Sequence, residues 1–206
     1  MSQEISCGTV SSGDELNQNY WNERWEKEET GWDIGYSSPT IEDYVTQYRN
    51  KNARILIPGC GNAHEAEFLL EKGFKDITIL DISDFAVNIL KEKFKHNPEV
   101  KVICEDFFTH KGQYDLMIEQ TFFCAIPTIM RSDYAKKASE LLNENGRIIG
   151  VLFNKIFEKK GPPFGGTEAE YRFTFKKYFE IDKMETCYNS IPQRTDSEVF
   201  INLKKK

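Results

Sequence analysis

The chain has 206 residues, of which 39% are hydrophobic, 29% charged and 13% aromatic. This composition and length fit one globular domain that buries its core without a disulfide or metal, and they exclude a disordered chain, a fibrous repeat and a small disulfide scaffold. The net charge of −6, from 27 basic and 33 acidic residues, opposes a general attraction to phosphate backbones. We therefore expect no nucleic-acid partner.

The cysteines and the N-terminal segment indicate a reducing compartment. The five cysteines are odd in number, with no C-x-x-C pair and no histidines at zinc spacing, so no metal site is expected. The segment before Glu15 carries charges and lacks the apolar core of a secretory signal, and no stretch approaches the roughly 18 apolar residues of a membrane helix. We expect a cytoplasmic protein; no feature indicates an oligomer, and a monomer fits.

From Arg54 onward, short apolar runs alternate with amphipathic segments of helical length. The runs predict strands at 54–58, 77–81, 100–104, 114–119, 147–153, 180–188 and 198–203. The segments between them predict helices at 63–72, from Ser83 to Pro98, from a Ser132 cap to 143, and from a Thr167 capping box to 177. The alternation predicts an α/β fold with a doubly wound, Rossmann-like sheet of about seven strands, mostly parallel, with an antiparallel terminal strand. We expect one domain over 1–206, with a helical cover at 1–50 and an α/β core at 54–203.

The loop after the first predicted strand carries a G-x-G pair, Gly59 and Gly61, which allows a tight turn and lets a ligand approach the backbone. The third glycine of a dinucleotide fingerprint would fall at His64, which disfavours an NAD-dependent oxidoreductase. Asp81 ends the second predicted strand, where a carboxylate can accept hydrogen bonds from ribose hydroxyls. Together these residues predict an adenosine site; the alternative is a pair of turn glycines and a helix-capping aspartate.

The next two predicted strands end in further candidates. Asp106 can accept from an adenine amino group, and Phe107 offers its backbone N–H or its ring; the alternative is a loop aspartate beside a core phenylalanine. Gln120 stands where the reactive end of an adenosine-linked ligand would lie. Phe122 and Phe123 follow it and either wall a substrate pocket or are buried packing.

Several motifs in this order make the chain similar to a known family. They are R-I-L-I-P-G-C-G-N-A-H-E (54–65), L-D-I-S (80–83), E-D-F-F (105–108), T-F-F-C-A-I-P (121–127) and G-P-P-F (161–164). With the triplet Trp21-x3-Trp25-x6-Trp32, they resemble the thiopurine S-methyltransferase family, and within it the plant halide and thiol methyltransferases. The Trp triplet and T-F-F-C-A-I-P make the resemblance specific to this family.

The resemblance implies a methyltransferase that binds S-adenosylmethionine. It implies that the three tryptophans close over the cofactor and substrate, that Gly59 and Asp81 hold the methionine part and the ribose, and that Asp106 and Phe107 contact adenine. Gln120 departs from the family, because plant relatives often have tyrosine there.

The three tryptophans also have a physical interpretation. Trp21 and Trp25 are four residues apart and share one helix face, and Trp32 follows after a turn. Aromatic faces attract a sulfonium cation by about 0.5 to 2 kcal/mol each, so these indoles suit a cover over S-adenosylmethionine. The alternative is a Trp-rich amphipathic helix packed on the sheet.

The expected reaction is methyl transfer to a small soft nucleophile, a thiol or a halide or thiocyanate, which needs no strong general base. No catalytic residue is assigned, because His64 lies in the glycine loop and His96 and His110 are expected at the surface. The alternatives are another small acceptor (a selenol, a metalloid or an oxyanion) or a non-catalytic S-adenosylmethionine-binding protein. The loop from Lys155 to Gly166 is either a moving cover over the acceptor or a static connection.

Overall fold

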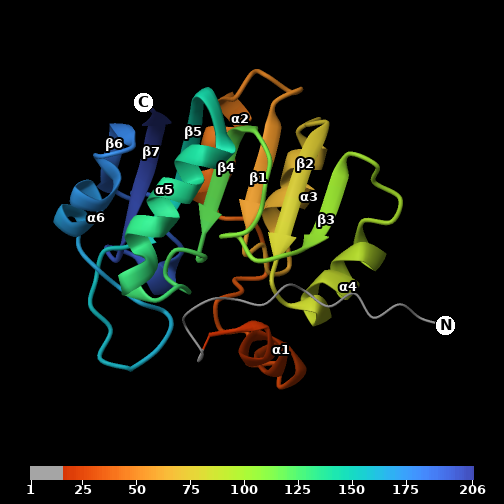
Figure 1. Ribbon diagram of the computed structural model, residues 1–206, viewed down its shortest axis with the longest axis horizontal. Helices are drawn as coiled ribbons and strands as arrows, with labels where there is room; N and C mark the ends of the chain where they lie inside the picture. Colours follow the sequence, from red (N-terminus) through yellow and green to blue (C-terminus); the bar gives the residue numbers. More distant parts are fainter. Residues whose placement is uncertain (1–15) are drawn as a thin grey trace.

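The structure is a computed structural model, and it describes residues 16–206 (Figure 1). Its elements in chain order are α1 (Gln18–Glu26), α2 (Pro39–Gln47), β1 (Arg54–Pro58), α3 (His64–Glu71), β2 (Asp76–Asp81), α4 (Asp84–Lys93), β3 (Val100–Cys104), β4 (Tyr114–Gln120), η1 (Thr128–Met130), α5 (Arg131–Leu141), β5 (Leu142–Phe153), α6 (Glu168–Phe175), β6 (Phe179–Thr186), η2 (Pro192–Arg194) and β7 (Glu198–Lys205).

All seven strands form one sheet in the order β3-β2-β1-β4-β5-β7-β6. The strands from β1 to β5 are parallel, and β7 runs antiparallel to both β5 and β6. The predicted fold class is confirmed, with the antiparallel strand second from the edge. The strand order reverses at β1, which lies between β2 and β4, and parallel sheets bind ligands at the carboxyl ends of the strands beside such a point.

Helices cover both faces of this sheet because its strands are apolar on both sides. Ile55 and Ile57 of β1 pack in one core with side chains of α2, α3 and α4, whereas Leu56 between them packs in the other core with α5 and α6. Figure 1 shows α5 and α6 in front of the sheet and α1 across the carboxyl ends of the central strands. The sheet edge that α1 covers, at the carboxyl ends of the central strands, is therefore the place where a ligand is expected.

Most helix boundaries follow the predicted caps. The Ser83 hydroxyl accepts from a backbone N–H of α4, and Thr167 forms the predicted capping box at the start of α6. The predicted Ser132 cap is wrong. Helix α5 begins at Arg131 without a side-chain cap, because the 3-10 turn η1 leads directly into it.

The boundary between α5 and β5 also differs from the prediction. The helix ends at Leu141 and the strand begins at Leu142, five residues before the predicted start at Arg147. Leu142 pairs with Tyr114 before the register shifts between Tyr114 and Leu116. This irregular ladder extends the strand over polar residues that the apolar pattern missed.

The predicted cover at residues 1–50 is divided by the structure. Ile41 and Val45 of α2 are fully buried against the sheet, so α2 belongs to a core layer. The described part of the cover is therefore α1 and the loop that follows it through Trp32.

Within residues 16–206, no helix is both long and apolar enough to cross a bilayer. No disulfide bond joins any two of the four cysteines in this range, and Cys7 lies outside the described residues.

Gly150 of β5 lies opposite Glu119 of β4, with no room for a side chain between the two strands. A Cβ at this position would lie 2.6 Å from the Cβ of Glu119 and would overlap the Glu119 carbonyl oxygen. We expect Gly150→Ala to force β4 and β5 apart and to lower the free energy of unfolding by roughly 2 to 3 kcal/mol, measured by urea denaturation. Gly31→Ala is the control, because its Cβ would meet no atom within 4 Å. Equal denaturation midpoints for the two variants would contradict the expected clash.

Candidate active site

A cavity of about 540 Å³ lies between α1 and the carboxyl ends of the parallel strands. Its walls come from α1 and the loop to Trp32, from the loops after β1 to β5, and from η2. The predicted site residues that line it are Trp21, Trp25, Trp32, Gly59, Gly61, Asp81, Asp106, Phe107 and Phe122. Residues from five distant parts of the chain therefore share one cavity.

The three indoles form a cluster centred on Trp32. The ring of Trp32 lies 5.6 Å from that of Trp21 and 5.9 Å from that of Trp25, edge to face in both cases. All three are half-buried. The indoles thus form one wall of the cavity, whereas a helix simply packed on the sheet would bury them in the core.

Asp33 attaches this cluster to the glycine loop. Its carboxylate accepts from the Gly35 N–H and the Asn62 side-chain amide, and its Oδ1 lies 2.9 Å from His64 Nε2. Burial opposes the charge of Asp33, but these three hydrogen bonds outweigh burial and lower its pKa. His64 therefore acts in the site by holding the cover, and it does not line the cavity.

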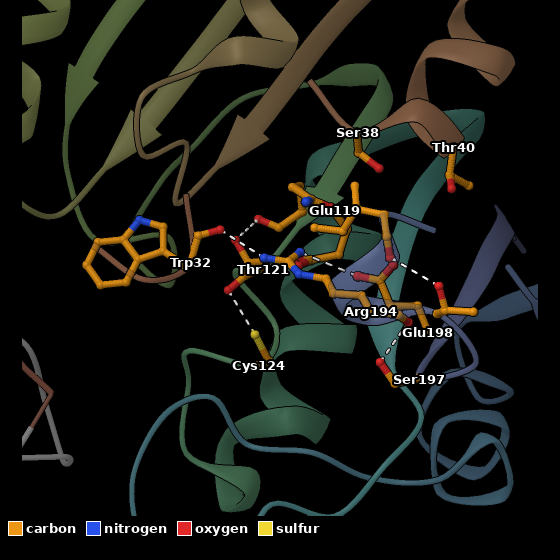
Figure 2. A network of polar contacts seen from close by, with 12 residues as sticks. Trp32, Ser38, Thr40, Glu119, Thr121, Cys124, Arg194, Ser197 and Glu198 are labelled. Atoms are coloured by element: carbon orange, nitrogen blue, oxygen red, sulfur yellow. Dashed lines mark hydrogen bonds and ion pairs between the residues drawn. The ribbon is translucent and has the colours of Figure 1, made fainter. Parts of the chain in front are cut away.

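Arg194 also holds the cover, through the backbone of Trp32, as Figure 2 shows. Its Nη2 donates to the Trp32 carbonyl oxygen at 2.9 Å, and its Nη1 lies 3.4 Å from Glu198 Oε1. The side chain is 11% exposed and its guanidinium lies 5.3 Å from the centre of the Phe153 ring. A nearly buried guanidinium, paired with Glu198, therefore lines the same cavity as the predicted adenosine residues.

Cys124 lines the same end of the cavity. Its thiol donates to the Thr121 carbonyl oxygen at 3.1 Å, and burial raises its pKa to about 12, with further help from the nearby charge of Glu119. This cysteine remains a neutral thiol and is not a nucleophile at neutral pH.

Two carboxylates lie at the other end of the cavity. Asp81 accepts from the Ser83 N–H at 2.9 Å and from the Gly61 N–H at 3.3 Å, and burial raises its pKa to about 6 against these hydrogen bonds. Burial likewise raises the pKa of Asp106, which accepts from the Phe108 N–H. The long second bond leaves Asp81 able to accept from a bound hydroxyl group.

Gly59 lines the cavity, and its contact with the methionine part of the cofactor stays a prediction. A Cβ at Gly59 would overlap the Phe122 ring, so the missing side chain also admits this ring. The Phe107 ring is also held in the core, where it stacks on Tyr134 at 5.2 Å and is 3% exposed. Phe107 was expected to contact adenine through its backbone N–H or its ring, and core packing already occupies the ring.

The structure brings neither Gln120 nor Phe123 to the cavity wall. Phe123 is buried, with its ring centre 5.0 Å from that of Tyr134 and 5.6 Å from that of Tyr171. For Phe123 the structure thus agrees with buried packing, the alternative to a pocket wall. Gln120 ends β4, and its Oε1 is buried without a hydrogen-bond partner in the described part of the chain.

Glu119 is a site residue that the sequence patterns missed. Its Oε1 accepts from the backbone N–H groups of Phe122 and Phe123 at 2.9 and 2.8 Å, and Tyr134 donates to its Oε2 at 2.6 Å. The side chain is fully buried, and burial raises its pKa to about 7. Glu119 thereby fixes the turn after β4, where Thr121 adopts a positive φ of 60° and the Phe122 ring meets the cavity.

The predicted surface position of His110 is wrong. Its ring is 3% exposed and lies 2.6 Å from a Glu105 oxygen and 2.8 Å from the Tyr114 hydroxyl. The polar sequence around it hides this position because its partners come from a loop and from β4. None of the three histidines lines the cavity, and residues 16–206 contain no group of three or more His, Cys, Asp or Glu side chains suited to a metal ion.

The fold and the cavity define a class of protein. The fold is similar to that of the Burkholderia thailandensis 1,6-didemethyltoxoflavin-N1-methyltransferase, solved with bound 1,6-didemethyltoxoflavin and S-adenosylhomocysteine. The two structures agree with a TM-score of 0.75 at 14% identity, over 98% of this chain and 93% of that chain. The chain therefore has the Rossmann-like fold of S-adenosylmethionine-dependent methyltransferases.

Sequence comparison identifies the family. The model of the thiopurine S-methyltransferase family matches residues 16–202. A probable thiol methyltransferase 2 of Arabidopsis thaliana is 33% identical over 73% of this chain and 69% of its own length, and thiocyanate methyltransferase 1 of the same plant is 32% identical over 90% and 84%. The chain belongs to the thiopurine S-methyltransferase family, and its cofactor is S-adenosylmethionine.

The raised pKa of Glu119 predicts a pH effect on stability. Because the folded protein holds this proton up to about pH 7 and the unfolded chain releases it near the ordinary value of 4.5, stability falls as pH rises through this window. Glu119→Gln keeps an acceptor for both N–H groups and cannot ionise. We expect this variant to gain roughly 3 kcal/mol relative to the original protein between about pH 4 and pH 8, measured by urea denaturation.

Glu180→Gln is the control, because Glu180 is an exposed residue of β6. If Glu119→Gln and the original protein show parallel stability curves across this pH range, the buried proton is ruled out.

Proposed function

We propose that this methyltransferase transfers the methyl group of S-adenosylmethionine to a small soft nucleophile, a thiol or an anion such as a halide or thiocyanate. The observation that carries the proposal is the Trp32-centred cluster of indoles, which lines the same cavity as Gly61 and Asp81. The two plant relatives, a probable thiol and a thiocyanate methyltransferase, support this class of acceptor.

The residues present fit the cofactor. Asp81 has acceptor capacity for ribose hydroxyls, and Asp106 can accept from an adenine amino group at the next strand end. The indole of Trp32 lies beside Gly61, with its Nε1 3.6 Å from the place of a Cβ. Trp21, Trp25 and Trp32 would surround the sulfonium, because aromatic faces attract a cation.

When bound, S-adenosylmethionine supplies a methyl group on a cationic sulfur. The indoles hold that charge and exclude water, and Asp81 orients the ribose. For the acceptor, Phe153 and Ile126 offer apolar walls that remove water from an incoming anion, and the Arg194 guanidinium lines the same cavity. A thiolate or halide attacks as an anion, so the chain has to align the partners and does not need a strong base.

We propose a cytoplasmic setting for this chemistry, because a reducing compartment keeps acceptor thiols reduced. The absence of disulfide bonds among the cysteines of residues 16–206 fits this setting.

The pKa of Asp81 gives a test of the ribose contact. The ionised carboxylate is the better acceptor, so affinity for S-adenosylhomocysteine should be full above about pH 6 and should fall as pH drops through this value. Asp81→Asn should weaken binding at least tenfold at about pH 8 and remove the pH dependence, measured by calorimetry. Asp76→Asn, at the start of the same strand, is the control. A level affinity in the original protein between about pH 5 and pH 8 would refute the contact.

The reaction is tested with labelled S-adenosylmethionine and a panel of thiols, iodide and thiocyanate, with volatile and soluble products measured separately. We expect methylated product from at least one acceptor, and a rate at least tenfold lower in Trp32→Ala, which removes the centre of the indole cluster. Phe173→Ala is the control, because Phe173 is exposed and does not line the cavity. Calorimetric binding without any product would favour the non-catalytic alternative.

A further inference from the structure

Charges of both signs line the cavity. Asp81 ends β2, and Glu105 and Asp106 follow β3, whereas Lys155, Lys159 and Lys160 all belong to the loop after β5.

The other charges of the wall are paired. Arg24 pairs with Glu29, which lines the cavity too, and Arg194 pairs with Glu198. Outside these pairs, the wall is acidic at the ends of β2 and β3 and basic in the loop after β5.

The three lysines have no carboxylate partner among residues 16–206. None of them forms an ion pair in this part of the chain. The ammonium of Lys155 lies 4.8 Å from the centre of the Phe157 ring. Other surface lysines, such as Lys136 and Lys183, do pair with carboxylates. Because the whole chain carries a net charge of −6, this local positive field is opposite in sign to the rest of the molecule.

The loop that carries these lysines is held against the cavity at its base. The Phe164 N–H donates to the Cys124 carbonyl oxygen at 2.7 Å, and the Gly166 N–H donates to the Lys155 carbonyl oxygen at 3.0 Å. Arg131 donates to the carbonyl oxygens of Phe164 and Gly165 at 3.0 and 2.9 Å. The ammonium groups are thus tethered at the cavity mouth from a fixed base.

We propose that Lys155, Lys159 and Lys160 recognise an acidic group on the acceptor that is separate from its nucleophilic sulfur, so that the preferred acceptors are thiols carrying a carboxylate. This inference rests on the proposed function. The sulfur enters between apolar walls such as Phe153, which cannot solvate a carboxylate, and the carboxylate remains at the mouth. There the exposed ammonium groups attract it, with a strength that salt reduces. Glu158 lies in the same loop but does not line the cavity.

The test compares mercaptoacetate with mercaptoacetamide, its neutral counterpart of the same size, and includes iodide. In Lys159→Gln/Lys160→Gln we expect KM for mercaptoacetate to rise about fivefold and KM for mercaptoacetamide to change less than twofold. Lys159→Glu/Lys160→Glu should enlarge the difference, and added salt should reduce it. Lys136→Gln/Lys183→Gln is the matched control, because it changes the net charge equally at remote sites and should leave both KM values unchanged.

The outcomes separate this inference from the proposed function. Equal changes in KM for the two thiols overturn the recognition of a carboxylate while methyl transfer to thiols stands. An equally large rise for iodide shows that the lysines attract any anion, and this also overturns the inference. If the original protein methylates iodide or thiocyanate but no thiol, the inference fails while the proposed function stands. If it binds S-adenosylhomocysteine and methylates none of these acceptors, both fail.

Discussion

The site depends on the attachment of the Trp32–Asp33 segment to the edge of the sheet. Trp32 belongs to neither hydrophobic core. Its backbone carbonyl accepts from Arg194 of η2, and the adjacent Asp33 is held by Asn62 and by His64. The Arg194 contact spans 162 residues of sequence, and the Asp33 contacts span 29 and 31. Both anchors fix the same short loop, and this brings the indole cluster into the cavity that Asp81 lines.

Hydrogen bonds also fix the turn after β4, which forms part of the cavity wall. A buried carboxylate that accepts two backbone N–H groups restricts the conformations of such a turn. Glu119 does this for Phe122 and Phe123, at the cost of burying an ionisable group. The ring of Phe122 then fills the space that Gly59 leaves, so the glycine and the buried glutamate act on one side chain.

The charges of the cavity wall lie on different elements. Carboxylates stand at the ends of β2 and β3, while three lysines come from the loop after β5. For the proposed transfer between a sulfonium and an anion, which neutralises charge, a cavity with separated charges holds both partners and still favours their reaction. In this proposal the lysines let an acidic chain admit an anionic acceptor.

The amino-acid sequence by itself determined the order of strands and helices, the glycine turn with Asp81, and the Trp triplet. Each of these follows from short-range periodicity, from turn chemistry or from residue spacing within one segment. The predictions of the Ser132 cap and of the start of β5 were wrong. A preceding 3-10 turn leads directly into α5, and pairing with Tyr114 starts β5 earlier than the apolar pattern indicates. Local patterns predict elements, and their ends are decided by neighbours.

Only the tertiary structure decided which side chains face the cavity. Phe122 and Phe123 are adjacent and chemically identical, yet one reaches the cavity wall and the other packs on Tyr134 and Tyr171. His110 is buried and Arg194 lines the cavity although both lie in polar sequence. The physical reason is that tertiary packing sets the burial of these groups. Phe123 packs on rings from α5 and α6, and Arg194 donates to a carbonyl 162 residues away, contacts that no local pattern contains.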